Sequence, residues 1–259
     1  MDLSNENIIH VKKDDVEYLQ FRELLKYADN FQHAYSLKPL QFSDKNEQAS
    51  ANYKKICKAL EIDSNQIIKS AQKHTDIVKD IEEYTDEKFE FVDGFITNKK
   101  NIPLVTKYAD CTPIILYDKI KNVIGNVHSG WRGTLQRISV KAAKLMMEKY
   151  DCNPADIIVC IGPCIKRCHF QVEPDFIAKF KQEFGNIDKY YNLGEVIEGK
   201  QKYYFDTTNL IIDYLSKIGI KRENIFDSDI CSVCNADSMS SYRAEKDKAD
   251  RNMNIVMLK

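Results

Sequence analysis

Apolar residues follow two periods along this chain, and each period indicates a different kind of element. In residues 134–150, Leu135, Ile138 and Ala142 recur at helical spacing, and Thr134 is placed to cap the first turn. Helices are also predicted at residues 52–60, from Pro174 onward, and from a cap at Asp206 to a stop at Gly219. Short apolar runs predict strands at residues 7–12 (an edge strand), 102–106, 114–117, 123–127, 157–161 and 254–258.

These strands and helices alternate along the chain with no internal repeat and no linker rich in Pro, Gly or Ser. A polar turn at residues 118–122 joins two of the strands as a hairpin, so the sheet is not purely parallel. We therefore expect an α/β (α+β) fold, with a mixed β-sheet core flanked by helices in a single domain spanning residues 1–259.

Composition places the chain among ordinary globular proteins. Hydrophobic residues make up 43% of the 259 residues and charged residues 30%, which is enough to bury a sizeable core. Lys and Arg (38) nearly balance Asp and Glu (39), so net charge gives no reason to expect a nucleic acid or an anionic membrane as a partner.

The sequence shows no recognisable targeting motif. The first residues lack the basic and apolar runs of a secretory signal, and no window approaches the roughly 20 apolar residues that span a bilayer. Eight cysteines in a chain of this length do not resemble a disulfide framework. We expect a cytoplasmic protein, a monomer or a homodimer, in which some thiols are buried and others bind a metal.

Two strand ends carry residues with metal-binding chemistry. His128 ends an apolar strand and precedes a turn bounded by Gly130 and Gly133, while Cys111 follows another predicted strand. Rigid elements of this kind aim side chains into a crevice. His74 lies in a polar segment 37 residues before Cys111, and His128 lies 17 residues after it.

Thiolate and imidazole groups are both zinc ligands, and ligands from distant segments are typical of catalytic sites. Three of them leave a fourth position for water or substrate. Spacing alone also agrees with a buried cysteine and two hydrogen-bonded core histidines.

Other motifs leave more than one interpretation open. Gly162-Pro163-Cys164 follows a strand, where a turn or an anion-binding nest of N–H groups fits the sequence. Cys231 and Cys234 form a CxxC pair without a second CxxC, so a structural zinc site is not expected, although a cluster with Cys160, Cys164 and Cys168 stays an alternative. Arg132, beside His128, is the better candidate to grip a phosphate than the basic residues near the C-terminus.

The motifs around these residues resemble those of the laccase-domain family, long labelled multicopper polyphenol oxidase, which includes the bacterial peptidoglycan-editing factor. The resemblance runs from about residue 70 to the C-terminus. Its main segments are residues 109–113, 128–133 and 161–164, and weaker matches lie at residues 72–74, 93–97, 170–172, 231–234 and 241–243.

The resemblance implies one zinc ion held by His74, Cys111 and His128, and activity on purine nucleosides with phosphate as co-substrate. Phosphorolysis is the leading expectation, including that of methylthioadenosine, and adenosine deamination is a further activity. In this interpretation Arg132 is a catalytic and phosphate-binding residue, and Asp110 is a candidate catalytic acid. A structural role for Asp110, as an N-cap or as a hydrogen-bond partner that orients a ligand, is an equal alternative. The substrate contacts expected of the same family are Lys38, Gln72, Arg132 and Arg243.

Several positions depart from the family pattern. Lys38 stands where an arginine is expected, and no Gly-Gly segment follows it. Met239 and Ser240 replace aromatic residues before Ser241, and Asp250 replaces a glycine before Arg251. These changes concern the phosphate and nucleoside contacts more than the metal ligands.

Three other functions stay open. Cys111 and His128 fit a metal-free thiol hydrolase, with the thiol as nucleophile and the imidazole as base. A copper phenol oxidase needs many imidazoles, whereas this chain has five histidines and no His-x-His motif, so copper is disfavoured as the cofactor. A metal-bound module without enzymatic activity is the fourth function.

Overall fold

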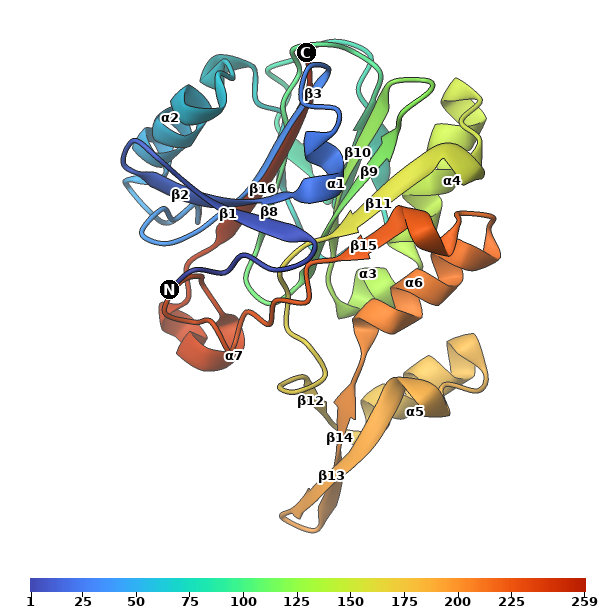
Figure 1. The fold of residues 1–259 in the computed structure, drawn as a ribbon. Helices are drawn as coiled ribbons and strands as arrows, with labels where there is room; N and C mark the ends of the chain where they lie inside the picture. Colours follow the sequence, from blue (N-terminus) through green and yellow to red (C-terminus); the bar gives the residue numbers. More distant parts are fainter.

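The computed structural model describes residues 1–259, and two β-sheets pack face to face at its centre (Figure 1). The first sheet is antiparallel, with strand order β1-β2-β3-β16-β8. Its strands are β1 (Ile8–Lys13), β2 (Val16–Phe21), β3 (Phe31–Ser36), β16 (Asn252–Leu258) and β8 (Leu104–Tyr108).

The second sheet is mixed, with order β15-β11-β9-β10-β7-β5. The outer pairs β11–β15 and β5–β7 are parallel and the inner pairs are antiparallel. Its strands are β15 (Ile225–Asp227), β11 (Ile157–Ile161), β9 (Thr112–Asp118), β10 (Val123–Ser129), β7 (Gly94–Thr97) and β5 (Val78–Asp80). A small parallel pair joins β4 (Ser70–Ala71) to β6 (Phe89–Glu90).

Alternation along the strands produces the layers. On β9, Ile115 and Tyr117 face the core between the sheets, whereas Ile114 and Leu116 face the helices. Helices α4 (Ile138–Tyr150) and α6 (Thr207–Lys217) cover the second sheet, and α2 (Ala49–Leu60) covers the first, so the four layers run α, β, β, α (Figure 1). The predicted mixed α/β fold with flanking helices is confirmed.

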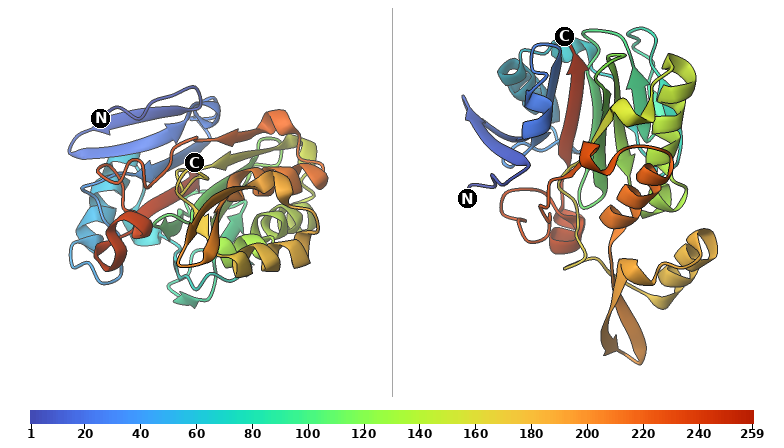
Figure 2. Two further views of the ribbon diagram at one scale, coloured as in Figure 1. Left: turned by 90° about the horizontal axis from the view of Figure 1, so that it is seen from below. Right: turned by 45° about the vertical axis from the view of Figure 1, so that its right-hand side comes forward.

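Residues 171–205 project from this body as a lobe, which is clearest in the right-hand view of Figure 2. It contains β12 (Gln171–Val172), β13 (Tyr191–Ile197), β14 (Lys200–Phe205) and α5 (Pro174–Phe184). Phe180 and Phe205 are fully buried in its own small core. The apolar pattern of the sequence predicts α5 here but not the hairpin of β13 and β14.

Most predicted elements are present, and the long predicted helix is the main difference. Residues 134–150 form two helices, α3 (Trp131–Leu135) and α4, because Arg137 adopts a left-handed conformation with φ of 58°. Thr134 does not cap a helix: α3 begins at Trp131, and the Thr134 hydroxyl contacts the Ser129 hydroxyl at 2.9 Å. The Asp206 cap of α6 is confirmed by its hydrogen bond from the Asn209 N–H.

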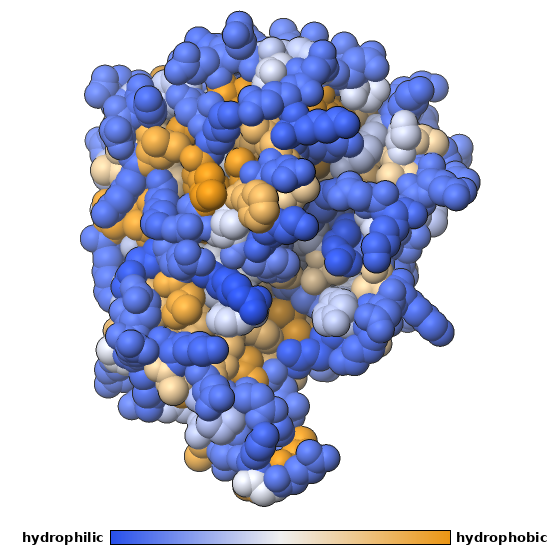
Figure 3. Space-filling model, turned by 180° about the vertical axis from the view of Figure 1, so that it is seen from behind, coloured by the Kyte–Doolittle hydropathy of each residue, from blue (hydrophilic) through white to orange (hydrophobic).

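The surface carries polar side chains over most of the face seen in Figure 3, and apolar groups appear on it in separate patches. No helix of the protein is both long enough and apolar enough to cross a bilayer. The remaining helices, α1 (Arg22–Leu25) and α7 (Tyr242–Glu245), are single turns.

Candidate metal centre and cavity

The three predicted metal ligands come together at one end of the two sheets. Cys111 lies in the turn that leads from β8 of the first sheet to β9 of the second, and His128 lies near the end of β10. His74 follows β4, and its Nε2 is 3.5 Å from the Cys111 sulfur. The ligand atoms of His74, Cys111 and His128 all lie within 4.8 Å of one another. We call these three residues the candidate metal site.

Asp93 holds two of these ligands in place. It is fully buried just before β7, and its Oδ1 accepts hydrogen bonds from the His128 Nδ1 at 2.7 Å and from the His74 backbone N–H at 3.1 Å. Its Oδ2 accepts from the N–H groups of Lys73 and Thr75. Because Asp93 engages Nδ1 of His128, the Nε2 of that imidazole is free to bind a metal.

Burial raises the pKa of the Asp93 carboxyl, but the hydrogen bonds from His128 and Thr75 outweigh burial and bring that pKa below its ordinary value. The sequence motifs did not identify Asp93 as a site residue. The only available signal was its place, as an acidic residue directly before a buried strand, inside a segment already matched to the family.

Cys111 and His128 shift each other's pKa. Burial raises the pKa of the Cys111 thiol, but the imidazoles of His128 and His74 lower it to about 6. Burial lowers the pKa of His128, but Cys111 and Asp93 raise it to about 9. Near neutral pH the sulfur is therefore a thiolate, which is the form that binds metals and attacks electrophiles.

Gly130 permits this close packing. A Cβ atom at this position would overlap Cδ2 of His74 and lie 3.3 Å from the Cys111 sulfur. The glycine that follows His128 is therefore required by the approach of the other two ligands rather than by its own φ of −69°.

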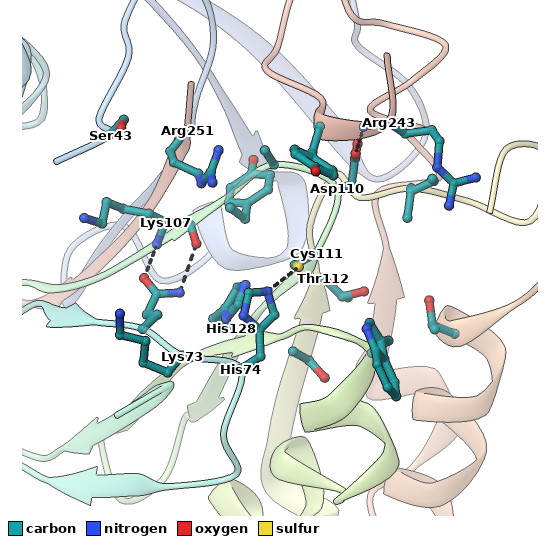
Figure 4. A pocket seen from close by; sticks show the side chains of 18 of the residues that line it. Ser43, Lys73, His74, Lys107, Asp110, Cys111, Thr112, His128, Arg243 and Arg251 are labelled. Carbon is teal, nitrogen blue, oxygen red and sulfur yellow. Dashed lines mark hydrogen bonds between the residues drawn. The ribbon is translucent and has the colours of Figure 1, made fainter. Parts of the chain in front are cut away.

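The candidate metal site opens into a cavity of about 730 Å³, a volume that suits a small-molecule ligand. Figure 4 shows Lys73, Lys107 and Arg251 on one side of the ligands and Asp110 and Arg243 on the other. The aromatic side chains of Trp131, Phe170 and Tyr242 also line the cavity.

Asp110 lies in this cavity as a hydrogen-bond acceptor. Its Oδ1 accepts from the hydroxyls of Ser232 (2.6 Å) and Ser241 (2.7 Å), and its Oδ2 accepts from the Arg243 backbone N–H (2.6 Å). Both carboxylate oxygens are therefore engaged by donors of the protein itself. These contacts join Asp110 to the segments that carry Ser232 and Arg243, and its predicted role as a catalytic acid stays a prediction.

Gln72 and Arg243 also line the cavity, but their polar groups bind the backbone. Gln72 bonds both the N–H and the carbonyl of Lys107, at 2.8 and 2.9 Å. The Arg243 guanidinium donates to the carbonyls of His169 (2.8 Å) and Gln171 (3.1 Å). Their predicted substrate contacts stay predictions.

Two predicted phosphate ligands lie outside the cavity wall. Arg132 is exposed, and its guanidinium stacks 4.2 Å from the centroid of the Trp131 ring. Lys38 donates to the carbonyl of Ala236 and forms an ion pair with Glu245 at 2.8 Å. Both residues were expected near the site because they lie in or beside the family motifs. Position in the sequence does not determine where a long side chain points.

The Gly162-Pro163-Cys164 segment is a structural turn and not an anion-binding nest. The N–H groups of Gly162, Cys164 and Ile165 all donate to backbone carbonyls, at 2.8, 3.2 and 2.9 Å. The expectation for the CxxC pair also differs from the structure, which places Cys168 and His169 beside Cys231 and Cys234. Cys168 and His169, which are adjacent in the sequence, supply the two further metal-binding side chains that a second CxxC would have supplied.

Comparison with known proteins agrees with the motifs. Residues 34–259 match the profile of the family described as multi-copper polyphenol oxidoreductase laccase. A purine nucleoside phosphorylase of Borreliella burgdorferi is 29% identical over 226 residues, which cover 87% of this chain and 90% of the relative. One from Clostridium acetobutylicum is 28% identical over 256 residues, which cover 97% of this chain and all of the relative.

Solved structures show the same fold. YlmD from Geobacillus stearothermophilus superposes with a TM-score of 0.85 at 18% identity, covering 97% of this chain and 99% of the other. The hypothetical protein YfiH of Bacillus licheniformis gives 0.84 at 23% identity, covering 96% and 99%. With the profile match over most of its length and the motif cysteine and histidines gathered in one cavity, the chain belongs to the laccase-domain family.

Proposed function

We propose that this protein is a zinc-dependent purine nucleoside phosphorylase. The observation that carries the proposal is the cluster of His74, Cys111 and His128 in the wall of a cavity that also presents cationic and aromatic side chains. Relatives covering nearly the whole chain bear the name purine nucleoside phosphorylase. Adenosine deamination and methylthioadenosine phosphorolysis are further activities that the same cavity could accommodate.

The donor set fits zinc better than copper. One thiolate and two imidazoles leave a fourth position of a tetrahedral ion open, as catalytic zinc sites do. A multicopper centre would need more imidazoles than this cavity offers: His10 contacts Glu17, His33 is buried against Phe21, and His169 lies beside Cys168. When bound, zinc would supply a positive centre that polarises an oxygen of phosphate or water.

The chain's own residues suit the two halves of the substrate. Lys107, which pairs with Asp44, and Arg251, whose Nη1 donates to the carbonyls of Ala249 and Asp250, lie on one side of the candidate metal site. Lys107 and the remaining guanidinium donors of Arg251 can balance the charge of a phosphate. Trp131, Phe170 and Tyr242 provide aromatic faces on which a purine can stack. In phosphorolysis, a phosphate oxygen forms a bond to C1′ of the ribose while the bond from C1′ to the purine nitrogen breaks, and the departing base takes up the proton that the attacking H₂PO₄⁻ loses.

A second candidate function rests on the pair formed by Cys111 and His128. A thiolate with a pKa of about 6, next to an imidazole, is also the arrangement of a thiol hydrolase. Metal content separates the two functions, because a thiolate bound to zinc is no longer a free nucleophile.

The test measures zinc content and release of base from adenosine and inosine, with and without phosphate. We expect base release that requires phosphate and disappears in His128→Ala, while His10→Gln, a change outside the cavity, retains it. Conversion of adenosine to inosine without phosphate would identify a deaminase. A metal-free protein that releases no base but reacts with thiol reagents at Cys111 would overturn the proposal in favour of the thiol hydrolase.

A further inference from the structure

A second group of metal-binding side chains lies where two loops meet. Cys168 and His169 belong to the loop after β11, and Cys231 and Cys234 belong to the loop after β15. We call these four residues the second cluster. None of them lines the cavity of the candidate metal site.

The distances within the second cluster match a tetrahedral metal site. Nδ1 of His169 lies 3.2 Å from the sulfur of Cys168, 3.4 Å from that of Cys234 and 3.7 Å from that of Cys231. The sulfurs of Cys168 and Cys234 are 3.8 Å apart, and all four ligand atoms lie within 4.8 Å of one another. Tetrahedral zinc, with Zn–S about 2.3 Å and Zn–N about 2.0–2.1 Å, requires S···S edges of about 3.8 Å and S···N edges of about 3.6 Å.

The backbone holds the two loops in this arrangement. Cys164 and Cys231 form a parallel β-bridge, with hydrogen bonds from the Cys164 N–H to the Ile230 carbonyl and from the Ser232 N–H to the Cys164 carbonyl. The loops are therefore joined before any ligand is considered. All eight cysteines are free thiols, so no disulfide occupies the sulfurs.

We propose that Cys168, His169, Cys231 and Cys234 form a second zinc site, distinct from the candidate metal site. Three sulfurs and one imidazole nitrogen fill all four tetrahedral positions, which is the pattern of structural zinc. No position is left for water or substrate. The ion therefore joins the two loops and takes no part in the reaction.

The joined loops support the wall of the cavity. Ser232, between the two cysteines of the CxxC pair, donates to Asp110, which directly precedes Cys111. The carbonyl of His169 accepts from the Arg243 guanidinium at 2.8 Å, and the Arg243 N–H donates to Asp110. The second site thus fixes the residues that hold the turn carrying Cys111.

Zinc stoichiometry of the full-length protein, purified under reducing conditions, tests the proposal. We expect two zinc ions per chain in the wild type and one in Cys234→Ser. Cys111→Ser removes the other zinc and also retains one. Cys164→Ser is the matched control, a neighbouring cysteine outside both sites, and it retains two.

Alkylation of the wild-type protein gives a second measurement that does not depend on how the variants fold. Cys168 and Cys234 are exposed, so as free thiols they are accessible to iodoacetamide, and a mildly alkaline buffer favours the thiolates that react. We expect both to be protected in the zinc-loaded protein and to become reactive after chelation, as measured by mass spectrometry of peptides. One zinc per chain that is lost in Cys111→Ser, together with reaction of Cys168 and Cys234 that chelation does not change, would overturn the proposal. A disulfide between cluster cysteines would do the same.

Discussion

Asp93 supports two of the three ligands of the candidate metal site. One of its oxygens contacts both His128 and the backbone of His74, so a single buried carboxylate orients two ligands. In Asp93→Asn the amide NH₂ would face the donors of His128, Lys73 or Thr75. We expect zinc affinity to fall about 10- to 100-fold, as it does when a partner behind a ligand is removed.

Competition with a chelator measures that affinity. Asp118→Asn is the matched control, because Asp118 is equally buried but accepts from the N–H groups of Ile120 and Lys121 in the hairpin turn at the other end of β9. Equal losses of affinity in both variants would show that Asp93 acts through general stability and not through the ligands.

The buried imidazole of His33 makes the free energy of unfolding depend on pH. It is buried, its Nε2 accepts the Phe21 N–H at 2.8 Å, and burial lowers its pKa from 6.5 to about 3. Between these two values the unfolded chain binds a proton that the folded chain does not. The free energy of unfolding therefore falls as pH decreases, by about 1.4 kcal/mol per pH unit from this group alone.

Urea denaturation at pH 6, 5 and 4 measures the slope. His33→Gln keeps a hydrogen-bond acceptor but cannot be protonated, so its loss of stability per pH unit should be smaller by that amount. Equal slopes in the two proteins would mean that His33 is protonated in the folded state.

At the scale of single residues, the chemistry of the ligands was predictable and their support was not. The sequence predicts His74, Cys111 and His128 from residue type and motif. It does not predict Asp93, because its partners are brought to it by folding. Arg132 and Lys38 show the reverse: their motifs place the backbone near the site, whereas stacking on Trp131 and pairing with Glu245 determine the side chains.

The turn between strand β10 and helix α3 contains a single glycine, Gly130, that limits which residue can stand there. Gly130→Ala would place a methyl group against His74 and the Cys111 sulfur. We expect the protein to fold but to bind less than one zinc at the candidate metal site, with activity lost in proportion. Gly125→Ala, inside β10, adds a methyl group against Leu116 instead and should keep its zinc.

Zinc analysis and circular dichroism of both variants check this prediction. Full zinc content in Gly130→Ala would mean that the turn shifts easily and that the packing of the ligands does not require a glycine.

Local patterns predicted the elements well where they depend on neighbours in sequence. The hairpin of β9 and β10 follows from two apolar runs and a polar turn. The division of residues 134–150 into two helices does not, since every apolar position fits one continuous helix. At the break, Arg137 pairs with Glu183 of α5 and donates to its carbonyl, and these partners lie far away in sequence.

At the scale of the whole molecule, the pairing of strands that are distant in the chain could not be predicted from the sequence. The C-terminal strand β16 lies between β3 and β8, and the predicted β-sheet core consists of two packed sheets. Alternation predicts which residues of a strand share a face but not which strand lies beside it. That residues 1–259 form one domain stays a prediction, although strands from both ends of the chain share the first sheet.

The distribution of charge over the molecule leads to the last prediction, which rests on the proposed function. The chain carries a net charge of −1, yet five cationic side chains and only two carboxylates line the cavity. Such a local excess attracts anions and is screened by salt. We therefore expect KM for phosphate to rise with ionic strength while kcat changes little.

The same reasoning separates Arg251 from Arg132. Arg251 lines the cavity, whereas Arg132 lies outside it on Trp131, and a charge-assisted hydrogen bond contributes about 1.5–3 kcal/mol. Arg251→Gln should raise KM for phosphate at least about tenfold and flatten its dependence on salt, while Arg132→Gln should change both less. The reverse order in steady-state kinetics would place the phosphate beside Arg132. It would require that guanidinium to leave the Trp131 ring when substrate binds.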